Sequence, residues 1–264
     1  MTSYETIEFS VDGGLATLTL SRPERLNSLN QQMHKEIRVV LKQVRVDDEI
    51  RCLLLTGNGR GFCAGQDLTD RTVSSDSQTP DLGQSIDKNY NPLIRRLTSL
   101  ELPVVCAVNG VAAGAGANIA LACDIVLAAK GASFIQSFSR IGLVPDSGGT
   151  WALPRLVGHS QAMALCLLGE KVAAADAQKM GMIWRVVDDE DLLNEATSIG
   201  RELAKGPTTG FALTKRALRA SSTNSLDEQL DLERDLQRIA GRTADYAEGV
   251  DAFVNKRTPT YRGL

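Results

Sequence analysis

Short apolar runs that end in glycine set the framework of this chain. RCLLLTG (51–57) and PVVCAVNG (103–110) have the length and the residue types of buried parallel strands. LATLTL (15–20) alternates as a strand with one buried face does. Helix-like segments separate these runs, and 43% of the 264 residues are apolar, which is enough for a substantial core. The pattern therefore predicts an α/β fold.

Helical periodicity appears in two parts of the chain. In residues 28–44 the apolar side chains recur at steps of three and four, and Ser28 with Gln31 forms a capping-box pattern at the start. After about residue 190 the strand patterns stop and successive helical segments follow, at 191–206, 210–221, 226–241 and 244–256. We therefore expect an α/β core over residues 1–195 and a helical region over residues 196–264.

Composition and charge exclude several classes of protein. The chain has 29 Lys and Arg against 32 Asp and Glu, a net charge of −3, and no basic stripe interleaved with aromatic residues, which argues against nucleic-acid binding. It has neither an export signal at its start nor an apolar run of about 18 residues that could span a membrane. The five cysteines show no C-x-x-C spacing, which favours reduced, packed thiols in a cytoplasmic protein without a zinc site.

Residues 69–87 are polar, aperiodic and longer than most loops of compact domains. Two interpretations fit this composition, a solvated surface loop and a lid over a binding site.

Three glycine-rich turns carry the chemistry, GRGFCAGQDL (59–68), NGVAAGAGANIALA (109–122) and LVPDSGGT (143–150). The first two follow strands, and the second runs into a helix whose first N–H groups attract negative charge. Neither has the spacing of a phosphate loop or a dinucleotide fingerprint, and a Gly-Ala run is also typical of close helix packing. Two facing N–H donors and one carboxylate could together stabilise an enolate and move its proton.

Asp146 is the acid of the third turn. Taken by itself, a P-D-S-G string is ordinary turn chemistry, in which the carboxylate bonds its own backbone. The functional alternative is a base whose pKa is raised by its apolar neighbours Leu143, Val144 and Phe138.

Five strings resemble the enoyl-CoA hydratase/isomerase (crotonase) superfamily along nearly the whole chain. They are RPERLNSLN (22–30), LLLTGNGRGFCAGQDL (53–68), VCAVNGVAAGAGANIALACDIVLAA (105–129), IGLVPDSGGTWALPRLVG (141–158) and AEGVDAFVNKRTP (247–259). The resemblance implies a spiral of β-β-α turns followed by a helical trimerisation region. It also implies an acyl-CoA substrate, no further cofactor or metal, and a homo-oligomer that is a trimer or a dimer of trimers.

The resemblance also assigns the site residues. It implies that the backbone N–H groups of Ala64 and Ala115 form an oxyanion hole for a thioester carbonyl, with Asp146 where isomerases and some dehalogenases of the superfamily place a catalytic aspartate. Asn118 and Phe138 occupy the positions of the two glutamates of the hydratases, and neither side chain can exchange a proton. The residues expected to line the bound coenzyme are Gly65, Gln66, Asp67, Leu68, Gly114 and Gly116. Asp67 is also typical of a turn residue without a catalytic role.

Several cations and one aromatic residue complete the expected contacts. Phe253 and Lys256 are implied to reach the CoA of a neighbouring subunit, although a cation at the end of a helix also suits the helix dipole. Arg22 and Arg25 are candidates for the CoA phosphates, although exposed arginines are commonly just solvated.

The activity implied is isomerisation of an acyl-CoA. Within the superfamily, strings such as VPDSGGTWALPR and MGMIWRVVDD resemble isomerases of phenylacetate catabolism, which convert the ring 1,2-epoxide of phenylacetyl-CoA into an oxepin. A shift of β,γ double bonds to the α,β position is also implied, with Asp146 as the proton-transfer group. The alternatives are an enoyl-CoA hydratase and a catalytically silent CoA-binding scaffold.

Overall fold

The computed structural model of the protein describes residues 3–68 and 81–264. Its central sheet has the strand order β1-β2-β3-β5-β7-β10, in which β1 is antiparallel to β2 and the other neighbours are parallel. The strands are β1 (Ile7–Asp12), β2 (Leu15–Leu20), β3 (Cys52–Gly57), β5 (Val104–Val108), β7 (Ile125–Ala129) and β10 (Arg185–Val187). The three strands that the sequence predicted are β2, β3 and β5, so these predictions are confirmed.

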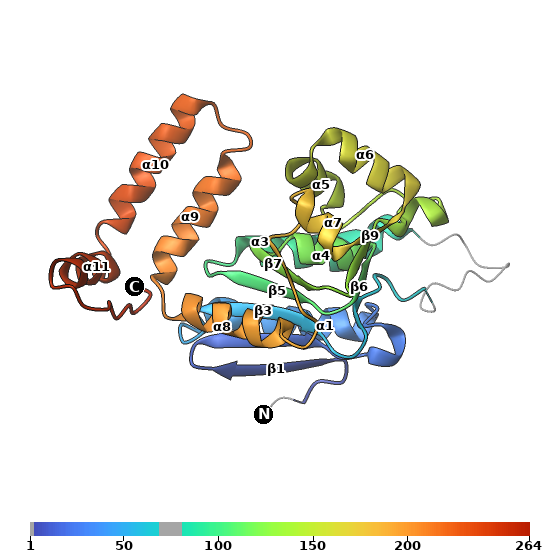
Figure 1. The fold of residues 1–264 in the computed structure, drawn as a ribbon, viewed down its shortest axis with the longest axis horizontal. Coiled ribbons are helices and arrows are strands. Elements are labelled where there is room, and N and C mark those ends of the chain that lie inside the picture. Colours follow the sequence, from blue (N-terminus) through green and yellow to red (C-terminus); the bar gives the residue numbers. More distant parts are fainter. Residues whose placement is uncertain (1–2, 69–80) are drawn as a thin grey trace.

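A second sheet of short strands lies beside the first, in the order β4-β6-β8-β9. Its strands are β4 (Gly61–Cys63), β6 (Val111–Ala113), β8 (Ser133–Ile135) and β9 (Lys171–Ala173). Strands β4, β6 and β8 are parallel, and β9 is antiparallel to β8. Each long strand β3, β5 and β7 continues into the next short strand, so both sheets advance by one strand at every turn of the chain (Figure 1). The expected spiral of β-β-α turns is confirmed.

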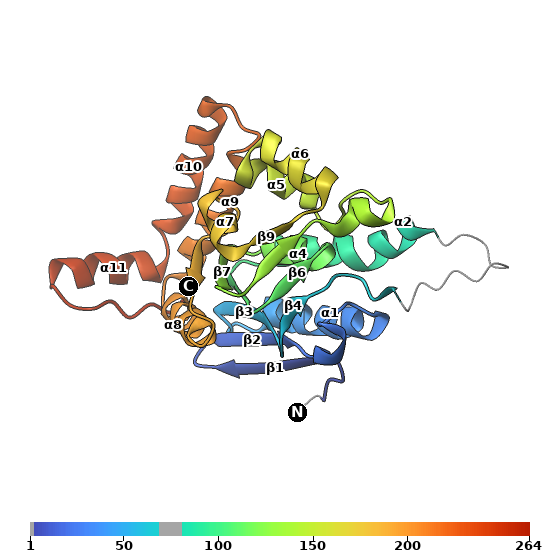
Figure 2. The ribbon, with the colours of Figure 1, turned by 45° about the vertical axis from the view of Figure 1, so that its right-hand side comes forward.

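Helices cover the sheets and connect the turns of the spiral (Figure 2). They are α1 (Gln31–Val46), α2 (Leu82–Ser85), α3 (Asn91–Ser99), α4 (Ala115–Leu121), α5 (Gly149–Val157), α6 (His159–Leu168), α7 (Ala174–Lys179) and α8 (Leu192–Ala204). Helix α8 packs against β3, β5 and β7, and α1 packs against α3. None of the helices in the described ranges is long and apolar enough to cross a lipid bilayer.

Two local predictions need correction. Helix α1 is capped by Asn30, whose side chain accepts a hydrogen bond from the N–H of Met33 at 2.8 Å, and Ser28 lies buried ahead of the helix. The segment expected to be a loop is helical from Leu82 onward, because Asp81 caps α2 and the fully buried Tyr90 anchors the π-helical turn that follows it. The remainder of that segment, 69–80, lies outside the described residues.

Three helices extend away from the sheets at the C-terminal end of the chain (Figures 1 and 2). They are α9 (Thr208–Ala220), α10 (Leu226–Ala240) and α11 (Ala244–Val254), and with α8 they confirm the four helical segments expected after residue 190. The predicted boundary at residue 195 lies inside α8, which packs on the sheet. The division of the chain at that residue stays a prediction.

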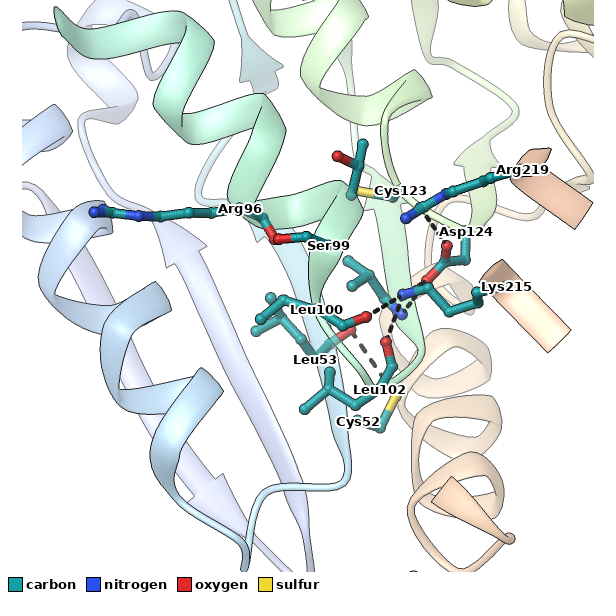
Figure 3. A network of polar contacts seen from close by, with 12 residues as sticks. Cys52, Leu53, Arg96, Ser99, Leu100, Leu102, Cys123, Asp124, Lys215 and Arg219 are labelled. Carbon is teal, nitrogen blue, oxygen red and sulfur yellow. Dashed lines mark hydrogen bonds and ion pairs between the residues drawn. The ribbon is translucent and has the colours of Figure 1, made fainter. Parts of the chain in front are cut away.

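Lys215 fastens α9 to the central sheet (Figure 3). Its ammonium group donates to the carbonyl oxygens of Leu100 at 3.0 Å and Leu102 at 2.6 Å, and it pairs with Asp124 at 2.5 Å. Arg219 of the same helix pairs with the other carboxylate oxygen at 2.9 Å. The Lys215 side chain is 12% exposed, and burial lowers the pKa of its ammonium group below the usual 10.5.

Replacing Lys215 by methionine should lower the free energy of unfolding by about 2–4 kcal/mol, because two buried carbonyls lose their donor and Asp124 loses a partner. A lowered lysine pKa means that the unfolded chain binds more protons, so the contribution of Lys215 to stability rises as the pH approaches 10.5. Urea denaturation of both proteins at several pH values measures this difference, which should widen with pH. Lys179→Met removes an exposed pair and is the control, with an expected loss below about 1 kcal/mol.

Candidate active site

Two backbone segments meet at the start of α4. One follows β4, the other follows β6, and these strands are paired. Gly65 has a φ of 86°, and a Cβ built on it would lie 2.9 Å from the Ala113 oxygen and 3.4 Å from the Ala115 nitrogen. Only glycine combines this backbone conformation with so close an approach. The two segments predicted to face each other are therefore in contact.

The first turn of α4 presents backbone donors. Gly114 is its N-cap residue with a φ of 53°, and the helical hydrogen bonds begin with the N–H of Asn118, which donates to the Gly114 oxygen at 3.2 Å. The N–H of Ala115 precedes that bond and has no acceptor within the helix. This position suits the oxyanion role expected for Ala115.

The expected role of Ala64 does not fit the structure. Its N–H donates to the carbonyl oxygen of Leu26 at 2.9 Å. That hydrogen bond joins the segment after β4 to the turn ahead of α1, so this N–H points away from the start of α4. The prediction that Ala64 contributes to the oxyanion hole is corrected on this ground.

The backbone N–H of Gln66 points in the direction opposite to that of Ala64, away from the turn ahead of α1. The Leu29 N–H donates to the Gly65 oxygen at 2.7 Å, and the Asp67 N–H donates to the Leu29 oxygen at 3.0 Å, which makes a parallel bridge between Leu29 and Gln66. In such a bridge the N–H and C=O of Gln66 itself point away from Leu29. Gln66 was predicted only to line the coenzyme site, because the pairing with residues 26–29 that orients it has no local sequence signal.

Asp67 and Arg22 form a largely buried ion pair. Their side chains are 6% and 15% exposed and lie 2.9 Å apart, and Arg22 also donates to the Ser28 oxygen at 2.7 Å. These contacts hold the segment after β4 against the turn ahead of α1. Asp67 therefore has a structural role as the partner of Arg22, and the Arg22 guanidinium is engaged within the chain.

The other expected coenzyme contacts lie around this segment. The Gln66 side-chain oxygen accepts a hydrogen bond from the Tyr90 hydroxyl at 2.6 Å. Leu68 is exposed, and Arg25 is exposed in the short helix Pro23–Arg25. Their contacts with a bound coenzyme stay predictions.

Asn118 joins α4 to the turn that carries Asp146. Its Nδ2 donates to the Asp146 carbonyl oxygen at 2.8 Å, and its Oδ1 accepts from Gln136 Nε2 at 2.8 Å. Asn118 follows Ala115 by three residues, so the residue that contacts the Asp146 turn lies about 4.5 Å along α4 from Ala115. The half-buried Asp146 carboxylate accepts a hydrogen bond from the Ser147 hydroxyl at 2.9 Å. Gln136 and Ser147 were not predicted, because no local motif marks either residue.

The Phe138 ring lies beside Gly114, at the start of α4. It belongs to the short helix Ser137–Ile141, it is 6% exposed, and a Cβ built on Gly114 would lie 3.7 Å from its Cζ. Asn118 is an amide and Phe138 a hydrocarbon ring, so neither can exchange a proton.

The shielding expected for Asp146 is incomplete in the single chain. Phe138 is buried as predicted, but Leu143 and Val144 are 37% and 73% exposed. Their side chains lie in the irregular connection ahead of α5, where solvent reaches them. Both side chains are accessible to solvent in the single chain, and their shielding of the carboxylate stays a prediction.

Helix α11, which carries Phe253 and ends just before Lys256, lies far from α4 in both views (Figures 1 and 2). Phe253 is 85% exposed on α11, and Lys256 follows the end of that helix. Their expected contact with the CoA of a neighbouring subunit stays a prediction. No cluster of three or more metal-ligating side chains occurs in residues 3–68 and 81–264.

Comparison with known proteins places the chain among relatives that match it from end to end. The model of the family described as Enoyl-CoA hydratase/isomerase matches residues 10–263. The chain is 58% identical over 259 residues to the 1,2-epoxyphenylacetyl-CoA isomerase of Escherichia coli (strain K12), which covers 98% of this chain and 99% of that protein. It is 46% identical over 261 residues to a probable enoyl-CoA hydratase of Rhodobacter capsulatus, with 99% of each covered. The crystal structure of an enoyl-CoA hydratase/isomerase from Cupriavidus metallidurans aligns with a TM-score of 0.92 at 32% identity, covering 100% and 98% of the two chains.

Proposed function

The chain belongs to the enoyl-CoA hydratase/isomerase family, and we propose that it is an isomerase that converts the ring 1,2-epoxide of phenylacetyl-CoA into the oxepin. The observation that carries the proposal is the 58% identity to 1,2-epoxyphenylacetyl-CoA isomerase over nearly the full length of both chains. The hydratase relative, at 46% identity, fits only the alternative.

The chemistry of the site supports an isomerase more than a hydratase. An isomerisation neither gains nor loses atoms, so one group that removes and returns a proton is sufficient. Addition of water needs one group to activate the water and another to protonate carbon. Asn118 and Phe138 supply neither group, whereas Asp146 is held beside α4.

We assign the following roles for the shift of a β,γ double bond. The N–H groups of Ala115 and Gln66 receive the thioester oxygen, which acidifies the α-carbon. Asp146 takes the α-proton, the negative charge moves onto the thioester oxygen, and Asp146 returns the proton to the γ-carbon. Each N–H that holds the oxyanion contributes about 3 kcal/mol to the transition state.

The coenzyme would lie along Gly65 to Leu68, with Arg25 near its phosphates. Phe253 and Lys256 would reach it from a neighbouring subunit, which makes a homo-oligomer part of the proposal. The apolar side chains exposed on α10 and α11 are consistent with a subunit interface; they are Leu226, Leu230, Ile239, Tyr246, Val250, Phe253 and Val254. A trimer and a dimer of trimers stay the two predicted assemblies.

The proposal is tested by following two substrates with the purified protein. We expect conversion of the ring epoxide of phenylacetyl-CoA, and conversion of a β,γ-unsaturated acyl-CoA to the conjugated thioester, which absorbs in the ultraviolet. The 2-enoyl product should not be hydrated. Hydration would favour the hydratase alternative, and binding of CoA without turnover of either substrate would favour the silent scaffold.

A further inference from the structure

Two buried amide side chains are linked by hydrogen bonds to the backbone of Asp146, the proposed catalytic residue. Asn118 of α4 is 1% exposed, and Gln136, directly after β8, is 5% exposed. Gln136 Nε2 donates to Asn118 Oδ1 at 2.8 Å, and Asn118 Nδ2 donates to the Asp146 carbonyl oxygen at 2.8 Å. The two amides form a relay that runs from the end of β8 to the turn of Asp146.

The relay has a fixed direction. The Asp146 carbonyl can only accept, so it requires Nδ2 of Asn118 on its side. Gln136 places a donor on the other side and so requires Oδ1 there. If Asn118 turned over, two acceptors would face each other at one end and two donors at the other. The Asp146 carbonyl therefore fixes the orientation of Asn118, and Gln136 supports that orientation from the other side without touching Asp146.

The turn that receives this hydrogen bond has an unusual backbone. Ser147 and Gly148 have φ values of 51° and 76°, and the former is a conformation that residues other than glycine seldom adopt. The Asp146 carbonyl accepts from the Gly149 N–H at 2.9 Å as well as from Asn118. A Cβ built on Gly149 would lie 2.7 Å from Asn118 Cγ, so the turn packs directly on the amide.

We propose that Asn118 and Gln136 are positioning residues, which hold the turn so that the Asp146 carboxylate faces the thioester bound at Ala115. The inference rests on the proposed function, because it assigns a task to Asp146. It accounts for an amide at a position where a hydratase needs a carboxylate: the amide donates the hydrogen bond that a carboxylate cannot.

Steady-state kinetics test the proposal. Asn118→Leu and Gln136→Met should each lower kcat about 10- to 100-fold because the reacting carboxylate is displaced. KM for the acyl-CoA should stay within about twofold, because neither side chain binds the coenzyme. The double variant should be no slower than Asn118→Leu alone, since Gln136 acts through Asn118. Thr6→Val removes a buried hydroxyl that donates to Glu36 just ahead of β1, and it should leave kcat unchanged.

Hydrogen exchange separates this proposal from the proposed function. In both variants the Gly149 N–H should exchange at least about tenfold faster than in the parent protein, while α4 keeps its protection. This exchange rate can be measured even if the parent protein converts neither substrate. In that case the proposed function is wrong, and the positioning role of the two amides is still tested. Unchanged exchange at Gly149, or losses of kcat that multiply in the double variant, would overturn the relay. Gln136→Met removes one hydrogen bond and gives this answer even if Asn118→Leu does not fold.

Discussion

Asp146→Asn should lower kcat for the double-bond shift about a thousandfold, because the amide cannot take up and return a proton. The turn should keep its shape. The contacts from Asn118 and Gly149 reach the backbone carbonyl of Asp146, and the Ser147 hydroxyl can still donate to the side-chain oxygen of the asparagine. KM should therefore change little. Ultraviolet absorbance of the conjugated thioester measures both constants.

A remote acid provides the control for this substitution. Asp176→Asn on α7 removes an exposed carboxylate and should leave kcat and KM unchanged. Equal activity of the parent protein and Asp146→Asn would mean that the carboxylate only stabilises its own turn. This is the role that the P-D-S-G string alone suggests. The proton would then have to be moved by another group.

The sequence predicted the helices and strands that are long enough to show a hydrophobic periodicity. Strands 15–20, 51–57 and 103–110 are six residues or fewer in the structure but apolar throughout or clearly alternating, and α1 has a full amphipathic face. The short strand β4, only three residues long, shows no alternation that could distinguish it from a loop. The second sheet was therefore visible only through the family resemblance.

Parts of the site could not be predicted because they depend on contacts between distant segments. The Ala64 N–H points at Leu26, and the Gln66 N–H to the opposite side, only because residues 64–67 pair with the turn ahead of α1. The relay from Gln136 to Asn118 likewise joins residues 18 positions apart. In contrast, Gly65 and the N-terminus of α4 were recognisable locally, since a glycine turn and a strand-to-helix step have sequence signals of their own.

Ala115→Pro should lower kcat/KM about 10²- to 10³-fold, the expected effect of losing one oxyanion donor. Proline has no N–H, and its ring would occupy the place where the thioester oxygen is received. Helix α4 should tolerate the change, because Ala115 is its first residue and proline is favoured there. Thermal unfolding and circular dichroism should confirm that the fold is intact before the kinetics are compared.

Ala115→Gly is the matched control, because it keeps the N–H and changes only a methyl group. It should retain activity within about tenfold, since the oxyanion donor is still present. Free CoA should bind equally to both variants in calorimetry if the coenzyme lies along Gly65 to Leu68, so that the loss in Ala115→Pro belongs to the reacting carbonyl. A proline variant with nearly full activity would show that the thioester oxygen is bound elsewhere. Asp146 would then face no polarised α-carbon at this position, and the direction of the relay from Gln136 would have to be explained by the stability of the turn alone.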